Sequence, residues 1–132
     1  MYQNGFGVPK DAAQAAYWYR KSAEQGEPSA QFILGVMYSN GTGVPKDAVQ
    51  AVFWLRKSAN QGHDAGQSGL SLMYYRGDGV PKDLVIAYMW VNLAAAQGKE
   101  TAKKVREALE KEMTPAQIAE GQRLSREWKP KP

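Results

Sequence analysis

The fold is decided by a stretch that reads MYQNGFGVPKD at residues 1–11, MYSNGTGVPKD at residues 37–47 and MYYRGDGVPKD at residues 73–83. The copies begin at Met1, Met37 and Met73, so the period is 36 residues both times. A fixed period of this size is typical of a solenoid, in which one small supersecondary unit is stacked on copies of itself. The repeat therefore predicts an extended surface, which favours binding to other chains over catalysis.

The composition is that of one globular domain. The chain has 132 residues, of which 43% are hydrophobic and 23% are charged. It has no cysteine, which excludes disulfides and the commonest zinc sites. The net charge of +4 is scattered over equivalent repeat positions such as Lys10, Lys46 and Lys82, as expected for solvated helix faces. We therefore predict no metal, no cofactor and no nucleic-acid partner, because nucleic-acid binding requires a denser basic cluster with aromatic residues between the charges.

The beginning of the chain leaves the compartment open. No apolar run approaches the ~18 residues that a membrane-spanning helix needs, and no signal peptide is visible. Met1 falls at the same repeat position as Met37 and Met73, so the chain starts in the middle of a unit. We expect a cytoplasmic location by default, and a periplasmic or secreted one if the true N-terminus is missing.

One complete unit predicts a pair of antiparallel helices. The first helix is expected over residues 28–39, with Pro28 in its first turn and Gly41 able to end it in a left-handed conformation. Gly35 lies inside this helix, which suggests that a second helix crosses close to it. The second helix is expected over residues 48–61, with Asp47 as N-cap and Gln50 completing a capping box.

Recurring residues define the structural positions of the repeat. Trp18, Trp54 and Trp90 occupy the same place in successive units, and we expect this ladder to be the main apolar contribution to the core. Asp11 and Gln14 are expected to cap the first unit as Asp47 and Gln50 cap the second. The full set of predicted structural positions is Gly5, Gly7, Asp11, Trp18, Leu34, Gly35, Tyr38, Gly41, Gly43, Asp47, Trp54, Tyr74, Gly77, Gly79, Asp83 and Trp90.

The pattern resembles the Sel-one-like repeat, which is related to the tetratricopeptide repeat. The residues that carry the resemblance read Leu34-Gly35-x-x-Tyr38, Gly41-x-Gly43-Val44-x-x-Asp47, Ala51-x-x-Trp54 and Ala59-x-x-Gly62. It covers residues 1 to about 98, in three copies. The resemblance implies an all-α, right-handed superhelical solenoid of helix pairs that acts as an adaptor or scaffold, in bacteria in envelope, secretion, signalling and host-interaction roles.

The predicted organisation is a single domain. It comprises a partial repeat at residues 1–26, complete repeats at 27–62 and 63–98, and C-terminal capping helices with a tail at 99–132. The first unit lacks most of its first helix, so an apolar face bearing Ala15, Ala16, Tyr19 and Trp18 is expected to be uncovered and to favour association with another copy or with preceding repeats.

The third unit departs from the pattern in both helices. Gly66 and Gly69 replace Ala30 and Ile33, which indicates either local flexibility useful for binding or drift at a tolerant site. Arg56-Lys57 become Asn92-Leu93, so the outer face of the second helix turns apolar and must be covered. We expect helices at residues 100–112 and 115–128 to cover it. Their apolar positions are Ala102, Val105, Ala108, Leu109, Ile118, Leu124 and Trp128, Thr114 is the N-cap of the second helix, and residues 129–132 form a frayed tail.

Enzymatic interpretations find little support in the sequence. His63 is the only histidine, so a Cys–His dyad and a histidine metal cluster are missing. The glycine-rich loops do not match a phosphate-binding motif, and Pro9, Pro45 and Pro81 remove an amide that such a loop would use. Some relatives are linked to β-lactam binding or hydrolysis, so a cell-wall or β-lactam-related hydrolase stays an alternative, although the chain has no S-x-x-K stretch. We predict no enzyme and no catalytic residues.

The preferred prediction is a protein–protein interaction module that binds a peptide or protein. By resemblance to tetratricopeptide repeats, the first helices of the units line a concave face. An acidic ligand residue near Arg76 is expected, and a structural oligomer built through the N-terminal end is a further alternative. The predicted concave-face positions are Ser29, Phe32, Val36, Ser39 and Asn40 in one unit and Ala65, Ser68, Leu72, Tyr75 and Arg76 in the next.

Overall fold

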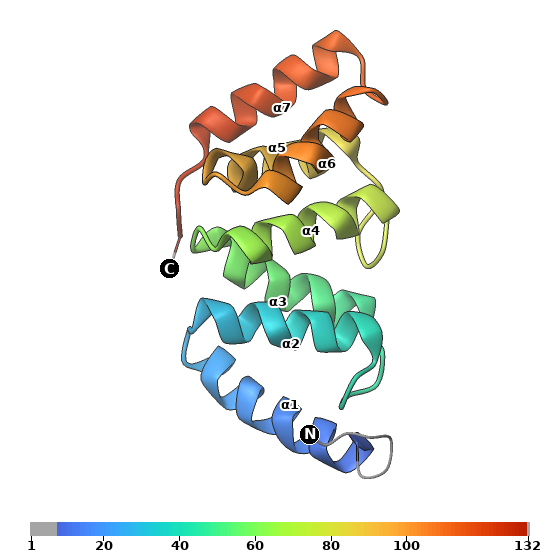
Figure 1. Cartoon of the computed structure of the whole chain (residues 1–132), viewed down its shortest axis with the longest axis vertical. Helices are drawn as coiled ribbons and strands as arrows, with labels where there is room; N and C mark the ends of the chain where they lie inside the picture. Colours follow the sequence, from blue (N-terminus) through green and yellow to red (C-terminus); the bar gives the residue numbers. More distant parts are fainter. Residues whose placement is uncertain (1–7, 132) are drawn as a thin grey trace.

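The computed structural model describes residues 8–131, and this part of the chain is an all-α, right-handed solenoid with no strand. Successive helices stack along the long axis of the molecule (Figure 1). Helices α2 and α3 form one antiparallel pair, α4 and α5 form the next, α1 precedes them, and α6 and α7 close the other end. The bounds are α1 Val8–Glu24, α2 Pro28–Asn40, α3 Ala48–Asn60, α4 Asp64–Arg76, α5 Leu84–Ala96, α6 Glu100–Glu110 and α7 Pro115–Glu127.

The helix pair α2–α3 forms because its ends and its crossing point are specified locally. The Glu27 carboxylate accepts hydrogen bonds from the amides of Ser29 and Ala30 at 2.8 and 3.1 Å and so caps α2. Gly41 ends that helix with φ of 72°, as predicted. A side chain at Gly35 would place its Cβ 2.8 Å from Leu55 Cγ, which confirms that α3 crosses close to this glycine.

The loop between the paired helices is fastened by aspartate. The Asp47 carboxylate accepts a hydrogen bond from the Gln50 amide at 3.1 Å, and the Asp47 amide donates to the Tyr38 carbonyl at 2.9 Å. Asp83 makes the same two bonds with Ile86 and Tyr74 at 3.0 Å.

The expected cap at Asp11 is wrong, because α1 begins at Val8 and Asp11 lies inside its first turn. In the complete units the loop is held by a tyrosine carbonyl of the preceding helix. The corresponding residue here is Tyr2, which lies outside the described residues, as do the predicted structural positions Gly5 and Gly7.

The tryptophan ladder is only partly a core feature. Trp54 and Trp90 are buried, at 5% and 4% exposure, and both belong to the central apolar cluster with Leu34, Leu55 and other residues. Trp18 is 67% exposed, so the expectation that all three indoles are buried is wrong. The reason is its place in the stack. Trp54 is covered by α1, whose Arg20 guanidinium lies 6.0 Å from its ring, whereas Trp18 stands on α1 itself.

Glutamine side chains join neighbouring repeats, a feature that the sequence pattern did not predict. The Gln97 side-chain amide donates to the Gly62 carbonyl at 2.9 Å and to Gln67 Oε1 at 3.0 Å. Gln61 makes the equivalent bonds one repeat earlier, to the Gly26 carbonyl at 3.0 Å and Gln31 Oε1 at 2.8 Å. Because Gln67 and Gln31 are almost fully buried, these bonds satisfy polar atoms that would otherwise be costly to desolvate.

The two extra glycines of the third unit have a packing role. An ideal Cβ at Gly66 would lie 2.7 Å from Ser58 Cβ and 2.9 Å from the Ala59 amide nitrogen, and one at Gly69 would lie 2.9 Å from Leu55 Cδ2. The glycines therefore let α4 approach α3 closely. Neither of the two expected explanations, local flexibility for binding or drift at a tolerant site, accounts for this close contact.

The C-terminal helices cover α5 as predicted. Asn92 accepts a hydrogen bond from Arg106 at 3.0 Å, and Leu93 packs against the core. Thr114 and Gln117 form the predicted capping box of α7. The expectation of a frayed tail is wrong at Lys131, because its amide donates a hydrogen bond to the Asn60 carbonyl. Within the described residues, no helix is long and apolar enough to cross a bilayer.

Candidate functional site

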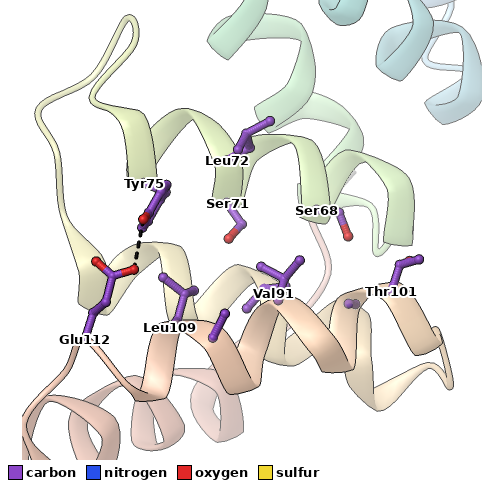
Figure 2. A pocket seen from close by; sticks show the side chains of 11 residues that line it. Ser68, Ser71, Leu72, Tyr75, Val91, Thr101, Leu109 and Glu112 are labelled. Atoms are coloured by element: carbon purple, nitrogen blue, oxygen red, sulfur yellow. Dashed lines mark hydrogen bonds between the residues drawn. The ribbon is translucent and has the colours of Figure 1, made fainter.

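A pocket of about 410 Å³ opens between α4 and α6, with α5 as its floor. Figure 2 shows Ser71 and Tyr75 of α4 directed towards α6, with Leu109 of α6 and Glu112 just after it opposite them. One wall is made by Ser68, Ser71, Leu72 and Tyr75, the opposite wall by Thr101, Ala102, Val105, Ala108, Leu109 and Glu112, and the floor by Val91.

Helical spacing places these residues on two facing stripes. Ser68, Leu72 and Tyr75 follow one another at intervals of four and three residues, so they share one face of α4. Thr101, Val105 and Ala108 do the same on α6. Serine and alanine side chains in both walls are too short to close the space between the helices. The α6 helix packs chiefly on α5, whereas α2 lies directly against α4. The pocket therefore opens on the side of α4 that faces α6.

The interior is apolar and one end is polar. Leu72 and Val105 line the pocket and are 43% and 48% exposed, which is high for apolar side chains of this size. At the polar end the Tyr75 hydroxyl donates to Glu112 Oε2 at 2.9 Å (Figure 2). This hydrogen bond to a carboxylate raises the pKa of Tyr75. The Lys82 ammonium also lies 5.4 Å from the centroid of the Tyr75 ring.

The structure brings three of the predicted concave-face residues together in this pocket, namely Ser68, Leu72 and Tyr75. Arg76 is exposed at the end of α4 and does not line it. None of the other predicted positions is buried: Ala65, Phe32, Val36 and Ser39 are half-buried, and Asn40 and Ser29 are exposed.

The contribution of α6 to the site was missed. Ala102 and Leu109 are buried as expected for a cap, but Val105 and Ala108 are exposed and face the pocket. The signal that could have revealed it is the width of the apolar stripe on α6. This helix carries more apolar positions than packing on α5 alone requires.

A second apolar surface lies at the first helix. Tyr17, Trp18 and Tyr19 are 53%, 67% and 36% exposed. Trp18 and Tyr19 line a shallow hollow of about 490 Å³ with Ser29 and Ile33 of α2. The expectation of an uncovered face is confirmed for Trp18 and Tyr19 but is wrong for Ala16, which is only 4% exposed.

The described residues contain no group of three or more His, Asp or Glu side chains placed to hold a metal ion. His63 lies half-buried at the N-cap position of α4, where its side chain makes no capping bond and its ring centroid is 6.0 Å from that of Phe32.

Solved structures of related proteins share this fold. A protective antigen present in uropathogenic Escherichia coli strains, which displays an SLR fold, matches with a TM-score of 0.85 and 38% identity, over 88% of this chain and 25% of that one. A Sel1 repeat protein from Oxalobacter formigenes matches with a TM-score of 0.68 and 39% identity, over 72% of this chain and 39% of that one. The chain thus spans a quarter to two fifths of the length of these proteins. No curated protein matches it.

The family model described as Sel1 repeat matches residues 1–27, 28–63 and 64–99, which is 99 of the 132 residues. The second and third matched segments coincide with the helix pairs α2–α3 and α4–α5, and the solved Sel1 structure has the same fold. The chain belongs to the Sel1 repeat family, whose members generally mediate protein–protein interaction.

Proposed function

We propose that this protein is a non-catalytic module that binds a peptide segment of a partner protein on the concave face, with the pocket between α4 and α6 as its anchor point. The observation that carries the proposal is the pair of exposed apolar side chains, Leu72 and Val105, on opposite walls of one pocket. Apolar groups held in water on both sides of a concavity favour a ligand that removes them from water.

The pocket suggests the chemistry of the ligand. A volume of about 410 Å³ lies near the lower end of the range for small-ligand sites and accommodates one large apolar side chain with its flanking backbone. Ser68 and Thr101 offer hydroxyl groups on facing walls, and Tyr75 with Glu112 forms the polar end. We expect the peptide to present a leucine or an aromatic residue to the pocket.

The rest of the peptide is proposed to run along α2 and α4. Half-buried Phe32 and Val36 supply apolar contacts and Ser39 and Asn40 supply hydrogen-bonding groups. An acidic residue of the peptide would be placed near the exposed guanidinium of Arg76. This arrangement corresponds to recognition of a short segment by a helix-lined groove.

The test is to select peptides from a random library on the purified chain and to measure their affinities for variants by calorimetry. Leu72→Asp is expected to weaken binding at least tenfold, since it places a charge in the anchor site. Val49→Asp is the matched control, because Val49 is 65% exposed on α3 and does not line the pocket. Unchanged affinity in Leu72→Asp, and in Tyr75→Ala and Arg76→Ala, would contradict the proposal.

A second candidate function, structural association through α1, is favoured by the exposure of Trp18. Light scattering at rising concentration tests it: Trp18→Ala would abolish any dimer, and a monomeric mass throughout would exclude self-pairing. The related proteins give no support to the hydrolase alternative.

A further inference from the structure

The tail after α7 fills a slot between the last two repeats. Figure 1 shows it running back past α5 toward α4. The Trp128 ring meets the Trp90 ring edge-on, with centroids 6.0 Å apart, and packs against the central core. It also lies against Gly62, and the Lys131 amide donates to the Asn60 carbonyl.

The same slot recurs one repeat earlier without an occupant from the described residues. Positions 36 residues before Trp90, Gly62 and Asn60 are Trp54, Gly26 and Glu24. These three residues line a hollow of about 460 Å³. Trp54 is 5% exposed, and its Nε1 is buried without a hydrogen-bond partner in the described part of the chain.

We infer that this hollow, lined by Ala23, Glu24, Gly26, Trp54, Lys57 and Gln61, binds an extended partner segment carrying a tryptophan followed by lysine, in the way that the tail binds beside Trp90. The inference rests on repetition within the fold: Ala23, Gln31 and Gln61 of the hollow correspond, 36 residues later, to Ala59, Gln67 and Gln97.

Charge distinguishes the two slots and indicates the ligand. Two charged residues of the hollow have uncharged counterparts in the filled slot: Glu24 stands at the position of Asn60, whose backbone carbonyl accepts the tail amide of Lys131, and Lys57 stands at the position of Leu93. The Glu24 carboxylate is the group that would pair with a lysine of the bound segment. The chain's own tail is held on its own Trp90 at high effective concentration, which favours a separate polypeptide as the occupant. The hollow is separate from the α4–α6 pocket and does not depend on it.

The test uses a synthetic peptide with the tail sequence of residues 126–132 and the ¹⁵N-labelled full chain. Peptide binding is expected to shift the amide signals of Gly26 and Glu24, the side-chain amide of Gln61 and the indole signal of Trp54. A peptide with alanine in place of its tryptophan is expected to bind at least about tenfold more weakly.

Variants locate the site. Lys57→Trp, an exposed position lining the hollow, is expected to block the peptide, and Glu24→Lys to weaken it several-fold. Lys21→Trp, at the equivalent exposed position on α1 and outside the hollow, is the matched control and is expected to leave affinity unchanged, as is Leu72→Asp. Circular dichroism confirms that each variant is folded.

Three outcomes would overturn the inference. The first is absence of shifts at millimolar peptide. The second is shifts confined to Gly62, Gln97 and Trp90, which would mean that the peptide only exchanges with the bound tail. The third is the same shifts around Trp54 appearing in the chain alone as its concentration rises, because the occupant would then be the tail of a second copy.

Discussion

Replacing Gly66 by alanine tests whether the third repeat is flexible or tightly packed. Glycine inside a helix costs about 1 kcal/mol relative to alanine, so the substitution would stabilise a helix with room for a methyl group. In this structure the new Cβ would lie 2.7 Å from Ser58 Cβ and 2.9 Å from the Ala59 amide nitrogen. Both atoms belong to α3, and one is backbone, so relief requires the helices to separate.

The magnitude follows from opposing contributions. Overpacking a close helix contact costs about 1–3 kcal/mol. Displacing Ser58 also strains the hydrogen bond that its hydroxyl donates to the Pro28 carbonyl at 2.9 Å, which is worth about 1 kcal/mol. After subtracting the helix-propensity gain of about 1 kcal/mol, we expect Gly66→Ala to lower the free energy of unfolding by about 1–3 kcal/mol.

Urea denaturation followed by circular dichroism measures this change, provided that the dependence of stability on urea stays constant. Gly69→Ala is the control in the same helix, because its Cβ would meet only side-chain atoms: the Leu55 Cδ2 methyl at 2.9 Å, which can rotate away, and Leu55 Cδ1 and Phe32 at 3.5 and 3.7 Å. We expect it to change stability by less than about 1 kcal/mol. A Gly66→Ala variant as stable as the parent, or more stable, would refute the packing explanation.

Three further predictions concern contacts made by the last repeat. Trp128→Ala should lower the free energy of unfolding by about 2–4 kcal/mol in urea denaturation, because it uncovers Trp90; an unchanged midpoint would mean that the tail does not stabilise the fold. Gln97→Ala should cost about 1–3 kcal/mol in the same assay, because it leaves the buried Gln67 oxygen without its donor, and Gln97→Glu should not restore stability. Burial, and then the hydrogen bond to Glu110, raise the pKa of Tyr88 above its ordinary 10.0, so the folded state holds this proton more tightly than the unfolded chain does. The resulting stability is complete below about pH 10 and is lost as pH rises further; thermal melts should show a steeper alkaline decline for the parent than for Tyr88→Phe, and parallel declines would contradict the assignment.

Local patterns predicted the repeating helices closely. The expected helices at residues 28–39 and 48–61 are observed as Pro28–Asn40 and Ala48–Asn60. Caps and turn glycines act over a few residues, so Asp47 and Gly41 could be assigned from their neighbours alone. The prediction was wrong at Asp11, which lies inside the first turn of α1 and not before it.

Only one of the two walls of the site could be predicted from the sequence. Helical periodicity and family resemblance identified the α4 wall with Ser68, Leu72 and Tyr75, because they share one helix face. The α6 wall was assigned to the cap, because periodicity shows which residues share a face but not which neighbour that face meets.

The sequence by itself determined the all-α class, the 36-residue period and the ends of the repeating helices, because these depend on interactions between residues close together in the chain. The tertiary structure alone decided that Trp18 is exposed while Trp54 is buried, that Gly66 is a contact between helices, and that the tail folds back onto Trp90. Each of these outcomes depends on which distant segment lies against a given residue. Identical residues at equivalent repeat positions acquire different environments because different segments lie against them.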